Sequence, residues 1–254
     1  MTAQEIIVQM ESLRDERQRR ELVRFFKTGP GQYGEGDEFL GLKVPQTRQV
    51  VKTIARNLPL DEVPTLLMSS WHEVRLCGLL VLVERFAKYA AKRMENNEQA
   101  IGERDHIVNM YLQHAHRANN WDLVDLSAPK ILGHWLLLPT RLGDKQAIVD
   151  DLATSESLWL QRMSMVCTWT TTRAGDPSWC LRYAIIHLHH RHDLMHKAVG
   201  WMLRELGKHG GIDLLRQFLA DHAHDMPRTT LRYAIEKMTP EERHYWMNLP
   251  HREG

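Results

Sequence analysis

Hydrophobic residues recur along most of the chain at the three- and four-residue spacing of amphipathic α-helices. In residues 5–13, EIIVQMESL, this spacing places Ile6, Met10 and Leu13 on one side of a helix. The same pattern runs through 74–90 (VRLCGLLVLVERFAKYA), 157–169 (SLWLQRMSMVCTW), 181–190 (LRYAIIHLHH) and 196–211 (HKAVGWMLRELGKHGG). Alternating apolar runs joined by hairpin turns are absent, so the sequence predicts an all-α protein.

A repeat with a fixed period is visible in the second half of the chain. The pentapeptide LRYAI occurs twice, at 181–185 and 231–235, and basic residues stand 35 positions apart (197 − 162 = 232 − 197 = 35) at Arg162, Lys197 and Arg232. Stacked helix pairs produce a period of this size. The sequence therefore predicts a HEAT-like helical-repeat solenoid, an α-α superhelix, that spans 1–254 as a single domain. If the pairs stack in register, the three cations line one surface; otherwise their spacing is a coincidence among many basic residues.

One long glycine-rich interruption, residues 28–41 (TGPGQYGEGDEFLG), separates two predicted helices. Its glycines resemble those of a phosphate-binding loop, but no strand precedes them and no GK[ST] sequence ends the stretch. A connection between helices is the favoured interpretation, with Pro45 near the start of the next helix.

Composition narrows the class of protein. The 254 residues are 43% hydrophobic and 26% charged, as in ordinary soluble domains, and the formal net charge is +1. Nucleic-acid binding would therefore depend on basic residues segregated to one face. The three cysteines have no CxxC spacing, and the apolar run CGLLVLV is too short to span a bilayer. We expect a soluble, cytoplasmic protein with no signal peptide and no membrane association.

The histidines of HLHHRHDLMH raise the question of a metal site. His187, His190, His192 and His196 include the three- and four-residue spacings that place ligands on one side of a helix. However, the stretch contains no HExxH motif, and Arg191 would oppose a bound cation. Solvated histidines at a helix end are the favoured interpretation, so we expect no metal ligands.

Arg162 and Trp201 have unusual helical neighbours. Those of Arg162 are all apolar: Leu158, Trp159, Met165 and Val166. The guanidinium of Arg162 therefore points to the buried side of its helix, where either a protein carboxylate or a bound anion such as phosphate must meet it. Those of Trp201 are mostly charged: Lys197, Ala198, Arg204 and Glu205. A tryptophan on such a face is covered either by an adjacent repeat or by a ligand such as a base or a sugar.

The stretch NNWDLVDLSAPKILG, residues 119–133, carries the clearest candidate chemistry. Trp121 and Asp125 are four residues apart and so share one face of a helix. One interpretation is structural, with Asp122 as the N-cap and Asp125 in the first turn, where the helix dipole favours it. The other is functional: a carboxylate beside an aromatic face suits a reaction that develops positive charge, such as N-glycosidic cleavage through an oxocarbenium-like state.

Several segments together resemble the AlkD-like DNA alkylation repair glycosylases, a family built from HEAT-like repeats. The resemblance runs over most of the chain and rests on FFKTGPGQYGEGDEFLGLKVPQTR, SSWHEVRLCGLLVL, NNWDLVDLSAPKILG, SESLWLQRMSMVCTW, HKAVGWMLREL and LRYAIEKM. It implies a concave positive groove that wraps duplex DNA. It also implies a hydrolase that excises cationic alkylated purines, such as 3-methyladenine and 7-methylguanine, without a metal or an organic cofactor.

The resemblance also assigns catalytic residues. The W-x-x-x-D pattern of the family falls on Trp121 and Asp125, and the tryptophan of its GWxLRE motif falls on Trp201. By this resemblance Asp125 stabilises the developing sugar cation and positions water, while the two tryptophans pack on the deoxyribose of the damaged nucleotide. The arginine of the WLQR motif falls on Arg162, which would hold a flanking phosphate. The DNA-binding residues expected are Arg162, Lys197 and Arg232.

In one respect the chain departs from the family pattern. The segment TGPGQYGEGDEF is longer and richer in glycine than the connection in the shortest active members, and its acidic residues Glu35, Asp37 and Glu38 would disfavour DNA if they faced the groove. The alternative is a non-catalytic protein of the same fold that binds distorted or branched DNA; a third class is a HEAT scaffold for other proteins. We expect a monomer whose partner is double-stranded DNA containing alkylated bases, and which is nucleoid-associated when it binds.

Overall fold

Helices dominate the computed structural model, which describes residues 1–250. Within those residues the only β-type pairing is an isolated bridge between Glu38 and Trp71, so the all-α prediction is confirmed. The chain forms two units. The first takes Met1–Ile131 and Leu138–Gly143, and the second takes Leu132–Leu137 and the chain from Asp144 to the end of the described residues. A single domain over 1–254 stays a prediction.

The helices of each unit follow one another closely along the chain. The α-helices of the first unit are α1 (Ala3–Ser12), α2 (Glu16–Phe25), α3 (Val44–Ile54), α4 (Val63–Leu67), α5 (His72–Tyr89), α6 (Glu98–Gln113) and α7 (Trp121–Ser127). Those of the second unit are α8 (His134–Leu137), α9 (Lys145–Thr154), α10 (Leu158–Val166), α11 (Thr168–Arg173), α12 (Ser178–Ile186), α13 (Asp193–Glu205), α14 (Ile212–His222), α15 (Arg228–Ala234) and α16 (Pro240–Met247). Short 3-10 turns lie at Leu60–Glu62, Lys92–Met94 and Ala115–Arg117, and π-helical turns at Pro129–Gly133 and Leu206–Gly210.

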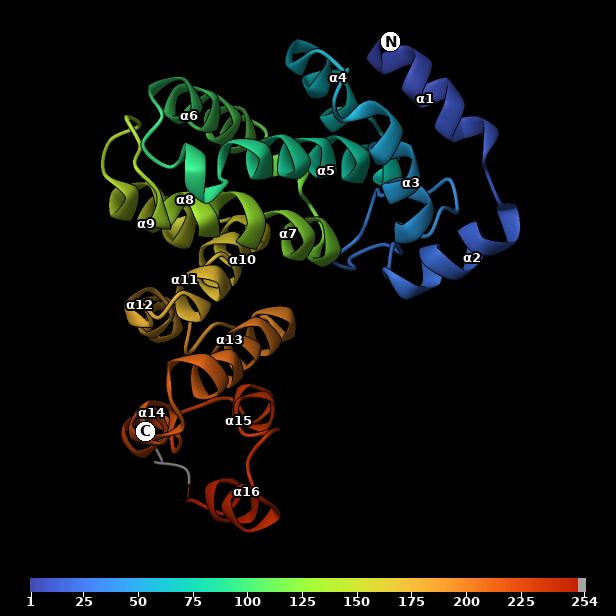
Figure 1. Ribbon diagram of the computed structural model, residues 1–254. Helices are drawn as coiled ribbons and strands as arrows, with labels where there is room; N and C mark the ends of the chain where they lie inside the picture. The colour runs from blue at the N-terminus through green and yellow to red at the C-terminus, as the bar shows by residue number, and fades with distance from the viewer. Residues whose placement is uncertain (251–254) are drawn as a thin grey trace. The chain divides into compact units, whose positions relative to one another are not determined.

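The core of the first unit is built around α5, which packs against α3, α4, α6 and α7 (Figure 1). Every residue from His72 to Val83 is buried, as expected for a helix that lies in the middle of its unit. Gly78 permits close packing against α4, because a Cβ at this position would lie 3.0 Å from Leu67 Cδ2 and 3.1 Å from Leu66 Cβ. The N-terminal half of α5 is therefore held close to α4.

The glycine-rich segment 28–41 lies between α2 and α3 and is anchored to α5. The carboxylate of Glu73 accepts hydrogen bonds from the backbone N–H groups of Leu40, Gly41 and Leu42 at 2.9–3.0 Å. Gly41 has a φ of +92°, and a Cβ there would lie 2.1 Å from the carbonyl oxygen of Asp15. Glycine is required by this close approach to the start of α2. The end of the segment is thus an ordered wall of the first unit.

In the second unit α13 packs against α10 and α15. Gly200 allows the close approach of α13 to α15, because a Cβ there would lie 2.5 Å from both the carbonyl oxygen of Thr230 and Cβ of Tyr233. The three helices that carry the basic residues of the 35-residue repeat are therefore consecutive neighbours within this unit.

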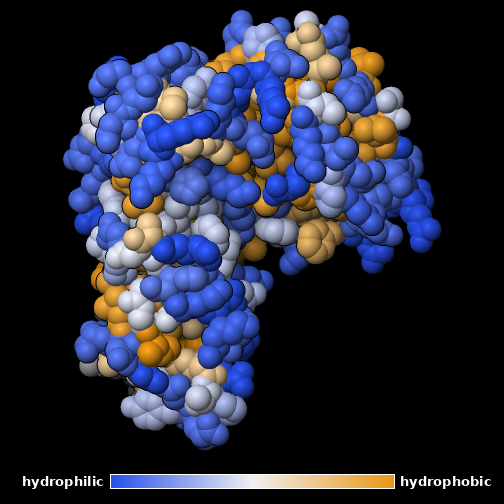
Figure 2. Space-filling view, in the orientation of Figure 1, coloured by the Kyte–Doolittle hydropathy of each residue, from blue (hydrophilic) through white to orange (hydrophobic). Residues whose placement is uncertain are grey.

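The face of the molecule that can be seen in the space-filling view (Figure 2) is mostly polar. On the face shown in Figure 2, hydrophilic side chains predominate and hydrophobic ones occur in separate patches. In the described part of the chain, no helix is both long enough and apolar enough to cross a membrane.

Cys77, Cys167 and Cys180 are free and buried, and burial raises the pKa of each thiol to about 12. These thiols are therefore core residues rather than nucleophiles.

Candidate functional site

A pocket of about 370 Å³ lies in the first unit between α2, residues 39–44, α5 and α7. We call it the Trp121 pocket. Its lining is mainly apolar and aromatic, with a few charged side chains: Leu22, Phe25, Phe26, Phe39, Leu42, Lys43, Val44, His72, Glu73, Leu76, Trp121, Asp122, Asp125 and Leu126. A volume of this size is typical of pockets that bind small organic groups.

Phenylalanine rings surround the indole of Trp121. The ring of Phe26 stacks on the indole with centroids 5.4 Å apart and planes at 28°, and Phe25 meets it edge-on at 6.0 Å. Phe39 in turn stacks on Phe26 at 5.2 Å. Phe25 is 62% exposed, although large aromatic side chains are usually well buried. Rings that are open to solvent beside a pocket can pack on the faces of sugars or bases.

Helix α7 brings Trp121 and Asp125 to the same pocket. Its N-cap is Asn120, whose Oδ1 accepts a hydrogen bond from the N–H of Trp121 at 2.9 Å. Trp121 is therefore the first residue of the helix, and Asp125 lies one turn later on the same face. Both are half-buried at the pocket. The interpretation that Asp122 caps this helix is wrong, because Asn120 holds that position.

The carboxylate of Asp122 instead bonds a buried histidine at the start of α5. Nε2 of His72 lies 2.9 Å from Oδ2 of Asp122, and Nδ1 lies 3.0 Å from Oδ2 of Asp37 in the glycine-rich segment. Burial by itself would lower the pKa of His72, but the charges of the two aspartates and their hydrogen bonds raise it to about 9. His72 is therefore an imidazolium at neutral pH.

Asp37 is the meeting point of several donors. Its carboxylate forms an ion pair with Arg75 and accepts hydrogen bonds from the side chains of Asn119 and Asn120 at 3.2 and 3.1 Å. Burial acts to raise the pKa of Asp37, but the bond to His72 and the charge of Arg75 lower it to about 2. Asp37 is 8% exposed, so it does not present its charge to a DNA groove.

Sequence reasoning missed His72, although a signal was present. His72, Glu73 and Arg75 are three polar residues in a stretch that is otherwise apolar and buried throughout. Charged groups on such a helix require partners, and each of these has them.

The second unit contains the other predicted site residues. Arg162 on α10 is 5% exposed, and its Nη1 donates to the carbonyl oxygen of Leu194 at 2.6 Å. Its predicted burial is therefore confirmed, and a backbone carbonyl is one of its partners. Lys197 forms an ion pair with Asp193 at 2.8 Å, one turn earlier on α13.

Trp201 and Arg232 lie on neighbouring helices of the same unit. Trp201 is half-buried on α13, one turn after Lys197, and Arg232 is exposed on α15. Of the six predicted site residues, Trp121 and Asp125 thus belong to the first unit and share a pocket. The remaining four belong to the second unit, on α10, α13 and α15.

Four of the five histidines of 187–196 form hydrogen bonds within the protein. His187 is buried, bonds the hydroxyl of Ser164 at 2.8 Å, and has a pKa that burial lowers to about 4. His190 bonds the side chain of Gln161 at 2.7 Å. Among residues 1–250, no group of three or more histidine, cysteine or acidic side chains is arranged to hold a metal ion.

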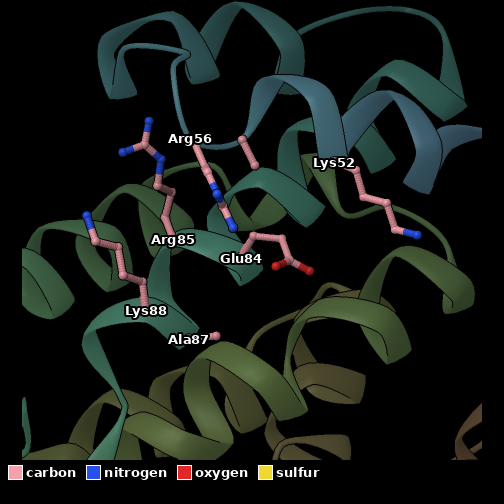
Figure 3. Close-up of a pocket in the computed structure, with 7 residues that line it drawn as sticks. Lys52, Arg56, Glu84, Arg85, Ala87 and Lys88 are labelled. Carbon is pink, nitrogen blue, oxygen red and sulfur yellow. The ribbon is translucent and has the colours of Figure 1, made fainter. Parts of the chain in front are cut away.

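A second pocket, of about 580 Å³, lies between the C-terminal parts of α3 and α5 and is strongly basic. We call it the α3–α5 basic pocket. Figure 3 shows Lys52 coming from α3, Arg56 following its end, and Glu84, Arg85 and Lys88 coming from α5. Its lining is completed by Ala55 and Ala87.

Further cations extend this basic surface. Arg48, Lys52 and Arg56 follow a four-residue spacing, which places them along one side of α3. Lys130 is close enough to Arg48 and Glu84 to feel their charges: burial and the charge of Arg48 lower the pKa of Lys130, and the charge of Glu84 acts to raise it. In the described part of the chain none of these four cations forms an ion pair, so the surface keeps its positive charge.

Comparison with known proteins gives matches among protein families and among solved structures. The family model described as DNA alkylation repair enzyme matches residues 6–238 of the chain. Among solved structures, the chain is similar to a predicted DNA alkylation repair enzyme from Enterococcus faecalis, with a TM-score of 0.66, 14% sequence identity, and coverage of 89% of this chain and 97% of that one. At this identity the likeness concerns the fold alone. A search of the curated proteins finds no match.

Proposed function

Because the chain belongs to the family of DNA alkylation repair enzymes, we propose that it is a DNA glycosylase. It excises cationic alkylated purines, such as 3-methyladenine and 7-methylguanine, from duplex DNA by hydrolysis of the N-glycosidic bond. The observation that carries the proposal is that Trp121 and Asp125 line one aromatic pocket. A carboxylate and an indole at one site are suited to a cationic transition state.

The proposed reaction moves positive charge from the base to the sugar. As the bond between the purine nitrogen and C1′ breaks, its electron pair passes to the base, which leaves as a neutral molecule. The carboxylate of Asp125 offsets the charge that develops on the sugar and orients a water molecule. The water oxygen bonds C1′ while its proton passes to the carboxylate. Trp121 and Trp201 pack on the deoxyribose and exclude other water from it.

Phosphate contacts provide the affinity for DNA in this proposal. Arg162, Lys197 and Arg232 bind phosphates from the second unit, and the α3–α5 basic pocket supplies further cations from the first. Such contacts are independent of base sequence, which suits an enzyme that must find lesions in any sequence. With a net charge of only +1, this segregation of cations is what makes DNA binding feasible.

The test is the release of methylated purines from alkylated duplex DNA by the wild type and by Asp125→Asn. Asparagine keeps the shape of aspartate but removes its charge, so release at saturating protein should fall on the order of a hundredfold. The matched control is Asp151→Asn, which makes the same substitution at an exposed position on α9 and should leave release unchanged.

Two results would count against excision. Equal release by Asp125→Asn and the wild type would remove Asp125 from the reaction. If neither protein releases purines while both bind duplex DNA, the non-catalytic binding of distorted or branched DNA becomes the better-supported function.

A further inference from the structure

The first unit contains a buried, charged histidine that the reaction above does not use. His72 is 2% exposed, and its two ring nitrogens lie 3.0 Å from Asp37 and 2.9 Å from Asp122. We propose that His72, held as an imidazolium between these two aspartates, is a positioning residue that fixes Trp121 and Asp125 at the Trp121 pocket. We call the three residues the His72 clamp. Its effect on excision rests on the proposed glycosylase function; the clamp itself rests on geometry.

The two contacts of His72 require a protonated ring. An imidazole can donate from both nitrogens only in its charged form. In the neutral ring, one nitrogen would direct a lone pair at a carboxylate oxygen 2.9 or 3.0 Å away. Burial keeps out the water that could relieve this repulsion. The clamp therefore retains its proton, in agreement with the pKa of about 9.

The clamp acts on the start of α7. Asp122 is the second residue of that helix, directly after Trp121 and three residues before Asp125. Asn119 and Asn120, the two residues before the helix, donate to the other aspartate of the clamp at 3.2 and 3.1 Å. α7 has seven residues, too few for a helix to be stable by itself. Its tertiary contacts therefore decide where its pocket-lining side chains lie.

Aromatic rings join His72 to the indole as well. Phe39 stacks on the imidazole with centroids 4.6 Å apart, and Phe26 lies 5.0 Å from it. Phe26 also stacks on Trp121 at 5.4 Å. An imidazolium on aromatic faces gains cation–π attraction, which the neutral ring lacks. Loss of the charge would thus loosen the same stack that supports Trp121.

The charged groups around His72 come from three elements. They are Asp37 and Lys43 between α2 and α3, Glu73 and Arg75 on α5, and Asp122 and Asp125 on α7. The residues that α2 contributes to the pocket, Leu22 and Phe25, are apolar. Glu73 bonds backbone N–H groups and Arg75 pairs with Asp37, so the two aspartates of the clamp determine the protonation of His72.

Nitrogen NMR of the wild-type imidazoles tests the clamp without any variant. Near neutral pH, both ring nitrogens of His72 should be protonated. His187 is the internal reference, because it is also buried but bonds only a hydroxyl through Nε2 and has a pKa lowered to about 4. A neutral His72 would overturn the proposal.

His72→Gln tests the positioning role, and His187→Gln is the matched control for removing a buried histidine. Single-turnover excision at saturating protein should fall tenfold to about a hundredfold in His72→Gln, because a small displacement of reacting groups has effects of this size. Its affinity for undamaged duplex should stay within about twofold of the wild type, since phosphate contacts provide that affinity. The control should excise like the wild type. Excision by His72→Gln at the wild-type rate would overturn the role.

Adding Asp122→Asn to His72→Gln provides a second variant if the single one fails to fold. Glutamine and asparagine leave no unpaired carboxylate in the buried site. The double variant should therefore be more stable than His72→Gln and should recover part of the lost excision. If the losses of excision caused by the two single substitutions instead add up in the double variant, as they do for independent sites, the clamp is overturned.

The indole N–H signal of Trp121 separates this inference from the glycosylase proposal. In His72→Gln this NMR signal should shift or broaden, and in His187→Gln it should stay in place, whether or not the protein excises bases. An unchanged signal in His72→Gln overturns the clamp even if the wild type is an active glycosylase. A shifted signal in a protein that releases no purines supports the clamp and overturns the glycosylase proposal alone.

Discussion

The ring of Phe26 lies against the indole of Trp121, with centroids 5.4 Å apart and planes inclined by 28°. Phe26 is the C-cap of α2, whereas Trp121 begins α7, so the contact joins two distant parts of the sequence. α2 has no buried residue of its own. The buried ring of Phe26 is therefore what connects the wall formed by α2 to the residues that carry the proposed chemistry.

Phe26→Leu should weaken both the fold and the reaction. The change keeps an apolar side chain but removes the stack on Trp121, so the free energy of unfolding should fall by about 1–2 kcal/mol in urea denaturation. Excision should also fall, because the indole loses its support. Phe218→Leu is the control: Phe218 is buried in the second unit and lies 4.7 Å from His222. A similar loss of excision in the control would mean that general instability explains the effect.

The His72 clamp predicts a specific dependence of stability on pH. The pKa of His72 is raised from 6.5 to about 9, so its contribution is complete below pH 6.5 and is lost as the pH rises to about 9. The pKa of Asp37 is lowered from 3.8 to about 2, so its contribution is complete above pH 3.8 and is lost as the pH falls toward 2. Denaturation midpoints measured across this range should decline at both ends. In His72→Gln the decline of the midpoint at alkaline pH should be smaller. If the decline is the same as in the wild type, groups other than His72 cause it.

The helices and the pairing of Trp121 with Asp125 could be predicted from the sequence, because both follow from spacing within one segment. Apolar periodicity marked α5 and α10, and a four-residue separation placed the tryptophan and the aspartate on one face of α7. These inferences need only the geometry of a single helix.

The clamp could not be predicted, because its members are far apart in the sequence. Asp37 and His72 are separated by 35 residues, and His72 and Asp122 by 50. Which partner each buried charge meets depends on how α5, α7 and the glycine-rich segment pack, and no local pattern specifies that packing. For the same reason the sequence left open whether Asp37 faces a DNA groove, whereas in the structure it is buried and paired with Arg75.

The α3–α5 basic pocket predicts a change in salt dependence. If Arg56 contacts one phosphate, Arg56→Ala should weaken binding to all duplex sequences and reduce the slope of log affinity against log salt by about 0.9. Glu84→Gln should strengthen binding, because it removes the carboxylate of the pocket. Fluorescence anisotropy titrations at several salt concentrations measure both.

The control for this prediction is an arginine whose charge is already paired. Arg216 lies 2.8 Å from Asp213 and 2.7 Å from Glu242. Arg216→Ala should therefore leave the slope unchanged. An unchanged slope in Arg56→Ala as well would exclude this arginine from the DNA interface.

A comparison of two buried arginines, Arg162 and Arg104, tests whether Arg162 binds phosphate or serves only in packing. Arg162 bonds the carbonyl of Leu194, and its helix α10 packs against α13, which carries Lys197. Within residues 1–250, Arg104 bonds only backbone carbonyls of its own unit, among them that of Tyr89. Truncation to alanine should cost either site about 1–3 kcal/mol of stability. Only Arg162→Ala should also weaken duplex binding, on the order of tenfold. Unchanged affinity in Arg162→Ala, with a loss of stability equal to that of Arg104→Ala, would show that its guanidinium serves the fold alone.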